Sequence, residues 1–150
     1  MRQKIKRMER ILHTREQERD IAQTELRRCR DEEETMEERV QFLDQERRRV
    51  LEEFTHLAGA CLSVQDLWYG RQRITCTETE LEEAMEELAR ARERVVRAER
   101  ELVERHQSVR MMETYVHKLQ VTSERLDLAS EQATLDDVAS IRHAMQEVRP

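Results

Sequence analysis

Hydrophobic residues recur along the first half of this chain in alternating steps of three and four, from Ile5 to residue 71. Fifteen of the twenty positions picked out in this way are apolar. A period of 3.5 residues keeps one apolar stripe facing a partner helix when two helices wind around each other. The pattern therefore predicts a long coiled-coil helix over residues 1–69.

The register changes after Arg71 and resumes at Leu81. Twelve of the fourteen positions in the new register are apolar: Leu81, Ala84, Leu88, Ala91, Val95, Ala98, Leu102, Val109, Met112, Val116, Leu119 and Leu126. Gly70 is suited to closing a helix, and Thr75, Thr77 and Thr79 each precede a glutamate by three residues, as in a capping box. These signals predict a turn at 70–77 and a second long helix over 78–130.

A second change of pattern follows Leu126. Thr134 and Asp137 have the spacing of a helix start, and a short periodic set follows: Leu135, Val138, Ile141, Met145 and Val148. The sequence thus predicts a short C-terminal helix over residues 134–149.

The predicted fold class is all-α, with two long coiled-coil helices in an antiparallel hairpin and a short C-terminal helix. An extended parallel rod is the alternative, but it would place the charged seam residues Arg15, Arg19, Glu33, Arg47 and Arg105 against their own copies. With a turn near residue 73, opposing residue numbers add to about 147. Leu43 should then face Leu102, and Arg47 should lie among Glu99, Glu101 and Glu104.

Composition excludes most classes of enzyme. With 40% charged residues and 3% aromatic residues the chain has too little apolar surface for a globular core, and two glycines give little scope for the tight turns of phosphate loops or nucleophile elbows. Cys29, Cys61 and Cys76 lack metal-binding spacing. We expect no catalytic, cofactor-binding or metal site, no small-molecule substrate, no membrane insertion and a cytoplasmic location.

Residues 54–76 are the exception to this polarity, since they hold both glycines, the tryptophan and only three charged residues. One interpretation is core packing, because Phe54, Leu57, Cys61, Val64 and Trp68 fall on the seam. The other is a partner-binding tip with aromatic and arginine anchors. The residues predicted for this tip are Leu62, Leu67, Trp68, Tyr69, Arg71 and Arg73.

The N-terminus carries a basic patch of Arg2, Lys4, Lys6, Arg7 and Arg10. The favoured function is a non-catalytic structural subunit that braces or tethers other coiled-coil or filament proteins, or further copies of itself, in a cytoskeletal or ciliary assembly. Two alternatives stay open: a nucleic-acid-associated regulator that grips phosphate through the basic patch, and a membrane-traffic tether. Aromatic residues for base stacking are absent from the patch, which disfavours nucleic acid.

Overall fold

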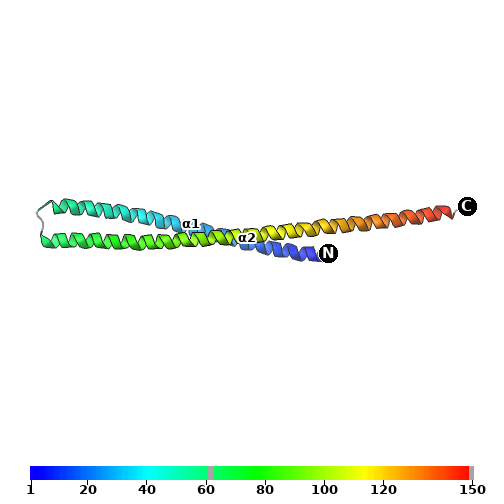
Figure 1. Ribbon diagram of the computed structural model, residues 1–150, viewed down its shortest axis with the longest axis horizontal. Coiled ribbons are helices and arrows are strands. Elements are labelled where there is room, and N and C mark those ends of the chain that lie inside the picture. Colours follow the sequence, from blue (N-terminus) through cyan, green and yellow to red (C-terminus); the bar gives the residue numbers. More distant parts are fainter. Residues whose placement is uncertain (61–62, 149–150) are drawn as a thin grey trace. The chain divides into compact units, whose positions relative to one another are not determined.

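Two α-helices account for nearly all of the described residues in the computed structural model, which are 1–60 and 63–148. Helix α1 spans Arg2–Ala58 and helix α2 spans Val64–Glu147 (Figure 1). The chain forms two compact units: Asp20–Val103, and Met1–Arg19 with Glu104–Pro150. In each unit a stretch of α1 packs against a stretch of α2 that runs the opposite way. The predicted all-α hairpin is therefore confirmed.

The seam between the helices follows the predicted register. In α1 the register residues from Ile5 to Phe54 are buried or half-buried, and in α2 the same holds from Leu81 to Ser123. Within residues 20–103 the small side chains of α2 lie against larger ones of α1. The two buried clusters are Leu26, Cys29, Val95 and Ala98, and Leu43, Leu81 and Ala84.

The pairing of the helices differs from the predicted one. Ion pairs across the unit of residues 20–103 join residue 30 with 99, 33 with 92, 47 with 78, and 53 with 73, so opposing numbers add to between 125 and 129. The expected sum of 147 is wrong. Leu43 consequently packs on Leu81 and not near Leu102, and Arg47 lies 3.7 Å from the carboxylate of Glu78.

The pairing shifts because the turn lies earlier than predicted. Helix α1 ends at Ala58 and α2 begins at Val64, so residues 70–77 are helical. Ser63 supplies the N-terminal cap: its hydroxyl accepts from the backbone N–H of Asp66 at 3.3 Å and donates to the Asp66 carboxylate at 2.9 Å. At the other side of the connection, the backbone N–H of Gly59 donates to the His56 carbonyl.

The threonines that suggested a helix start are inside α2. The hydroxyls of Thr75, Thr77 and Thr79 each donate to the backbone carbonyl four residues earlier, at 2.9–3.0 Å. A side chain bonded in this way is satisfied within the helix and does not cap it. The capping-box spacing was therefore present without a helix end.

Gly70 is helical and does not close α1. When the α2 register is continued backwards from Leu81, it passes through Thr77, Ile74, Gly70 and Leu67, all of which are half-buried. A Cβ on Gly70 would come 2.7 Å from the Phe54 ring, so the missing side chain allows α1 to approach closely at this point. Gly70 has no positive φ, which excludes the predicted left-handed cap.

The separate C-terminal helix predicted at 134–149 is also wrong, because α2 continues without a break to Glu147. The Thr134 hydroxyl donates to the Ser130 carbonyl at 2.9 Å and again lies inside the helix. No glycine or proline occurs between residues 71 and 149 to interrupt the backbone ladder. The change of pattern thus marks a change of surroundings and not a helix end.

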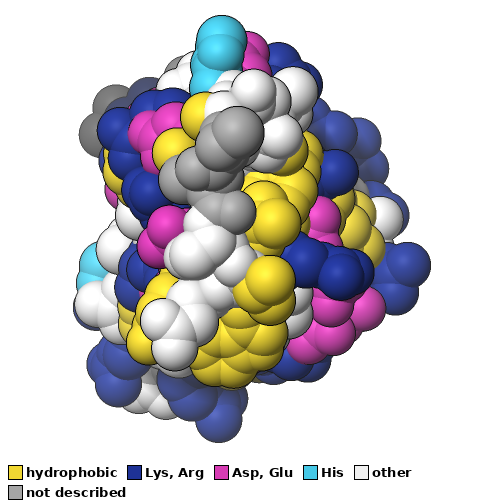
Figure 2. All heavy atoms as spheres, turned by 90° about the vertical axis from the view of Figure 1, so that its left-hand side faces the viewer, with side chains coloured by type: hydrophobic (Ala, Val, Ile, Leu, Met, Phe, Trp, Pro, Cys, Tyr) yellow, Lys and Arg dark blue, Asp and Glu magenta, His cyan; other side chains and the backbone are white. Residues whose placement is uncertain are grey.

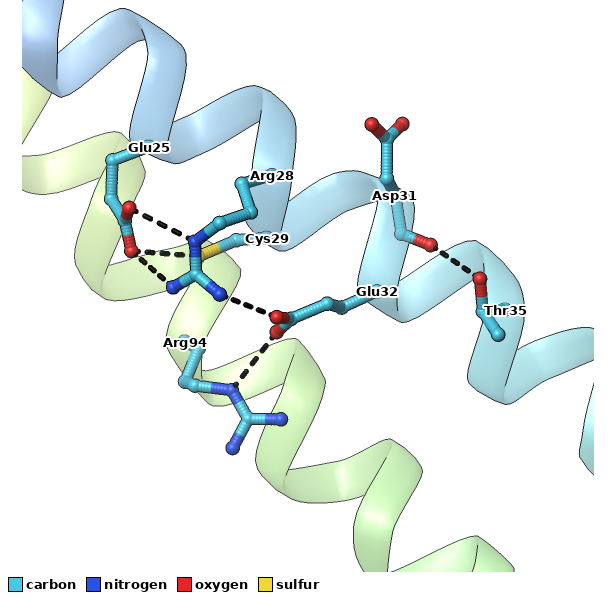
Figure 3. Close-up of polar contacts among 7 residues, drawn as sticks. All are labelled: Glu25, Arg28, Cys29, Asp31, Glu32, Thr35 and Arg94. Atoms are coloured by element: carbon cyan, nitrogen blue, oxygen red, sulfur yellow. Dashed lines mark hydrogen bonds and ion pairs between the residues drawn. The ribbon is translucent and has the colours of Figure 1, made fainter.

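Charged side chains border the seam. In Figure 3, Arg28 bridges Glu25 and Glu32 of its own helix, and Arg94 of α2 approaches Glu32 at 3.7 Å. The hydrogen bond from Arg28 lowers the pKa of Glu25, and the same pairing raises the pKa of Arg28. Arg28 stays charged at any physiological pH, and the contact of Arg94 with Glu32 joins this group of α1 residues to α2.

The unit built from the two chain ends has its own contacts. Val109 and Val116 of α2 are buried in it. The Glu18 carboxylate accepts from both Arg15 and Arg105, at 3.3 and 3.1 Å, so these two of the predicted seam arginines are paired. No charged residue of the described chain is fully buried, which fits a seam whose charges sit at its edge.

Candidate partner-binding site at the hairpin tip

The end of the hairpin where α1 passes into α2 exposes large apolar side chains. Four of them form what we call the hairpin tip: Leu57, Val64, Trp68 and Tyr69. Trp68 and Tyr69 are 57% and 65% exposed. Figure 2 views the molecule from this end and shows hydrophobic side chains gathered in the foreground, with Lys, Arg, Asp and Glu beside them.

Local contacts hold this surface in one arrangement. The rings of Trp68 and Tyr69 meet edge to face, with centroids 5.2 Å apart and planes at 75°. The Ser63 cap fixes the first turn of α2, and the Arg73 guanidinium donates to the Glu53 carboxylate of α1 at 2.8 Å. An ordered aromatic pair loses little conformational freedom on binding, which favours its use as an anchor.

The structure divides the residues predicted for the tip. Trp68, Tyr69 and Arg71 are exposed, whereas Leu67 is half-buried on the α2 seam and Arg73 is paired with Glu53. Leu62 lies outside the described residues, as does the seam residue Cys61. The side chains of Trp68, Tyr69 and Arg71 therefore remain available for contact.

Leu57 and Val64 join the tip although the sequence placed them on the seam. The core-packing interpretation also fails for Trp68, while Phe54 is half-buried as that interpretation expected. The first-half register continues formally through Val64 and Trp68, but α1 has already ended at Ala58. Continuing the α2 register backwards would have placed Leu67, not Trp68, on the seam.

The basic patch is a second predicted site and lies on the first turns of α1. Its five residues are exposed: Arg2, Lys4, Lys6, Arg7 and Arg10. Arg2 lies 3.9 Å from the Asp127 carboxylate of α2, a long contact between exposed side chains that contributes little to stability.

Residues 1–60 and 63–148 contain no group of three or more His, Cys, Asp or Glu side chains placed to hold a metal ion, and neither helix has an apolar stretch long enough to span a bilayer. Cys29 is a buried free thiol whose pKa is raised by burial and then by the Glu25 carboxylate, so it stays protonated and unreactive.

These features define an antiparallel coiled-coil hairpin with an exposed pair of aromatic residues at its tip. Residues 3–147 match the family described as flagellar FliJ protein. The chain belongs to the FliJ family. No match was found among curated proteins or among solved structures.

Proposed function

We propose that this chain is a non-catalytic coiled-coil protein of the bacterial flagellar assembly that binds a partner protein through its hairpin tip. The family match over nearly the whole chain supports the flagellar context. The observation that carries the binding role is the exposed Trp68–Tyr69 pair, held edge to face at the end of a two-helix hairpin. Tryptophan and tyrosine are the residue types most enriched among energetically dominant interface contacts.

The mechanism that follows is positioning and not chemistry. A hairpin presents its tip at a fixed distance from other surfaces of the same unit, and the cap at Ser63 and the Arg73–Glu53 pair keep the tip from fraying. Arg71 lies exposed near the aromatic pair and offers hydrogen bonds to a polar rim. In this proposal the protein acts in the cytoplasm as a component of flagellar export.

The family match favours a flagellar assembly over a cytoskeletal or ciliary one. The cytoskeletal or ciliary prediction rested only on the frequent use of helical subunits in such structures, whereas the flagellar assignment rests on a match to this sequence. The nucleic-acid and membrane-traffic alternatives gain no support from these findings.

The test is complementation in a bacterium that carries this chain, after its gene has been deleted. We expect the deletion to abolish or strongly reduce swimming in soft agar, the wild-type chain to restore it, and the double variant Trp68→Ala/Tyr69→Ala to fail. Phe42→Ala is the matched control, because Phe42 is an equally exposed aromatic residue of α1 away from the tip. This control should swim normally.

Two outcomes would count against the proposal in different ways. Normal swimming of the deletion strain would remove the flagellar assignment. Normal swimming of the double variant, with the Phe42→Ala control also normal, would leave the flagellar assignment and remove the tip from it. Circular dichroism of each purified variant should show unchanged helicity, because the substituted side chains are exposed.

A further inference from the structure

The last turns of α2 carry an apolar face that no part of α1 covers. Arg2, the first residue of α1, lies beside Asp127, so α2 runs on for about twenty residues, roughly 30 Å, with no helix opposite (Figure 1). We call residues 128–148 the C-terminal extension. All of its side chains are exposed, including six large apolar ones: Leu128, Leu135, Val138, Ile141, Met145 and Val148.

The apolar residues of the C-terminal extension share one side of the helix. Val138, Ile141, Met145 and Val148 follow steps of three, four and three, which is the spacing of a coiled-coil seam. Ile141, Met145 and Val148 also line a shallow surface hollow. A contiguous exposed face of this kind marks an interaction site in a soluble protein, and an isolated helix of twenty residues is only marginally stable in water.

The apolar residues of the C-terminal extension follow a register that lies one residue later than the seam between α1 and α2, since the seam register continued from Ser123 would fall on Ser130, Ala133, Asp137, Ser140 and Ala144. Val109 and Val116 are buried against α1 in the same unit, and the half-buried seam positions extend to Ser123. Beyond that point α2 still carries an apolar face, in a register shifted by one residue. A further helix that covers this face would pack against Val138, Ile141, Met145 and Val148.

The charge around this face selects among the helices that could cover it. The C-terminal extension, residues 128–148, holds four acidic side chains and one arginine, a net charge of −3 with His143 neutral. Residues 1–10 carry the opposite charge, with five basic side chains and one acidic side chain. In this segment Arg2 approaches Asp127 of α2. A second C-terminal extension would bring acid against acid, which disfavours self-association through this face.

We propose that the C-terminal extension binds an amphipathic helix of a partner protein whose apolar stripe is bordered by lysine and arginine. The apolar face supplies affinity, and the acidic border supplies the choice of partner and speeds its approach. This surface is distinct from the hairpin tip, so the inference does not depend on the function proposed for the tip.

The binding test uses the full-length chain and two synthetic 21-residue helical peptides. Both peptides carry the same leucine and isoleucine stripe; one has Lys and Arg beside the stripe and the other has Glu at the same positions. By fluorescence anisotropy we expect the basic peptide to bind at least tenfold more tightly, and this preference to shrink in about 1 M salt, where the screening length is about 3 Å. Equal binding of the two peptides would overturn the proposal.

Variants locate the binding on the chain. Ile141→Asp should weaken binding of the basic peptide at least tenfold, because it places a carboxylate in the apolar face. Ser140→Asp adds the same charge one residue earlier, about 100° round the helix and off the face of Val138, Ile141, Met145 and Val148, and should leave the affinity within about twofold. Equal effects of the two variants would contradict the proposal.

Hydrogen exchange tests where the basic peptide binds, and the solution mass tests whether a second copy of the chain covers the same face. The basic peptide should slow amide exchange in residues 128–148, and protection confined to other residues would place the site elsewhere and overturn the inference. Sedimentation equilibrium of the unbound chain should give one chain. A dimer that Ile141→Asp dissociates would show that a second copy covers the face, in place of the basic helix proposed.

Discussion

Helix α2 presents two stretches that contrast in an unexpected direction. Between residues 81 and 98 the alanines of the seam, Ala84, Ala91 and Ala98, are buried, with Ala91 only 1% exposed, whereas between 128 and 148 the larger residues of α2 are open to solvent, with Leu135 64% and Met145 68% exposed. Hydrophobicity alone would predict the reverse. The difference lies in the opposing helix, which is present in the first stretch and missing in the second.

The contrast separates two uses of an apolar helix face. In the covered stretch, alanine lets the backbones approach, and larger residues of α1 such as Leu43 fill the remaining space. In the uncovered stretch, large side chains would add little to the stability of the free chain. The exposed apolar residues of the uncovered stretch should therefore tolerate substitution in the free protein, while the smaller, buried residues of the seam should not.

The largest expected effect comes from matched substitutions of alanine. Ala91→Asp would bury an unpaired carboxylate in the seam and should cost about 3–5 kcal/mol of unfolding free energy. Ala129→Asp makes the same change on the uncovered stretch, where the carboxylate stays hydrated, and should cost less than about 1 kcal/mol, mostly through helix propensity. Urea denaturation followed by circular dichroism measures both. Comparable losses would mean that α1 does not cover Ala91.

A smaller difference is expected when leucine is shortened to alanine. Leu81→Ala removes a side chain packed on Leu43 and should cost about 2–3 kcal/mol, at the low end for leucine because a two-helix seam can partly close the gap. Leu135→Ala should change the stability by less than about 0.5 kcal/mol in the free chain. The same denaturation curves decide, and a large loss for Leu135→Ala would reveal a covering surface already present in solution.

The sequence was a good guide to burial along the seam. The alternating steps identify the half-buried or buried face of α1 through Phe54 and of α2 from Leu81 to Ser123. They do so because a 3.5-residue repeat keeps the same stripe of side chains against the opposing helix. The antiparallel hairpin followed from the charged seam residues. Their partners did not, because each residue of error in the position of the turn shifts the sum of opposing numbers by two.

The turn was misplaced because two physical signals coincided by chance. Val64, Trp68 and Arg71 keep the phase of the first helix although they belong to the second, and Thr75, Thr77 and Thr79 have the spacing of caps while bonding inside a helix. Ser63 with Asp66 was the cap. The C-terminal helix was mistaken for a separate element for a related reason, since loss of the seam pattern reflects loss of the opposing helix.

The sequence predicted that exposed aromatic residues lie at the hairpin tip, but it identified only some of the residues there. Trp68, Tyr69 and Arg71 are exposed as expected from an unusually apolar segment in a polar chain. Leu57 and Val64 were missed because their exposure depends on where α1 ends, and periodicity does not fix that point. Leu67 was assigned to the tip for the same reason and lies on the seam.

The smallest expected effect concerns the charges that border the covered stretch. The hydrogen bond from Arg28 holds the pKa of Glu25 below its ordinary value of 4.5, so ionised Glu25 stabilises the fold above that pH, and the contribution is lost as the pH falls through the lower folded value. The melting temperature of wild type should exceed that of Glu25→Gln slightly at pH 6, and the difference should shrink steadily as the pH is lowered below 4.5. In an Arg28→Gln background the difference should be absent throughout this pH range. A difference that does not shrink on acidification, or that survives without Arg28, would show that Glu25 acts through packing, and the border charges would then add nothing to the contrast between the two stretches of α2.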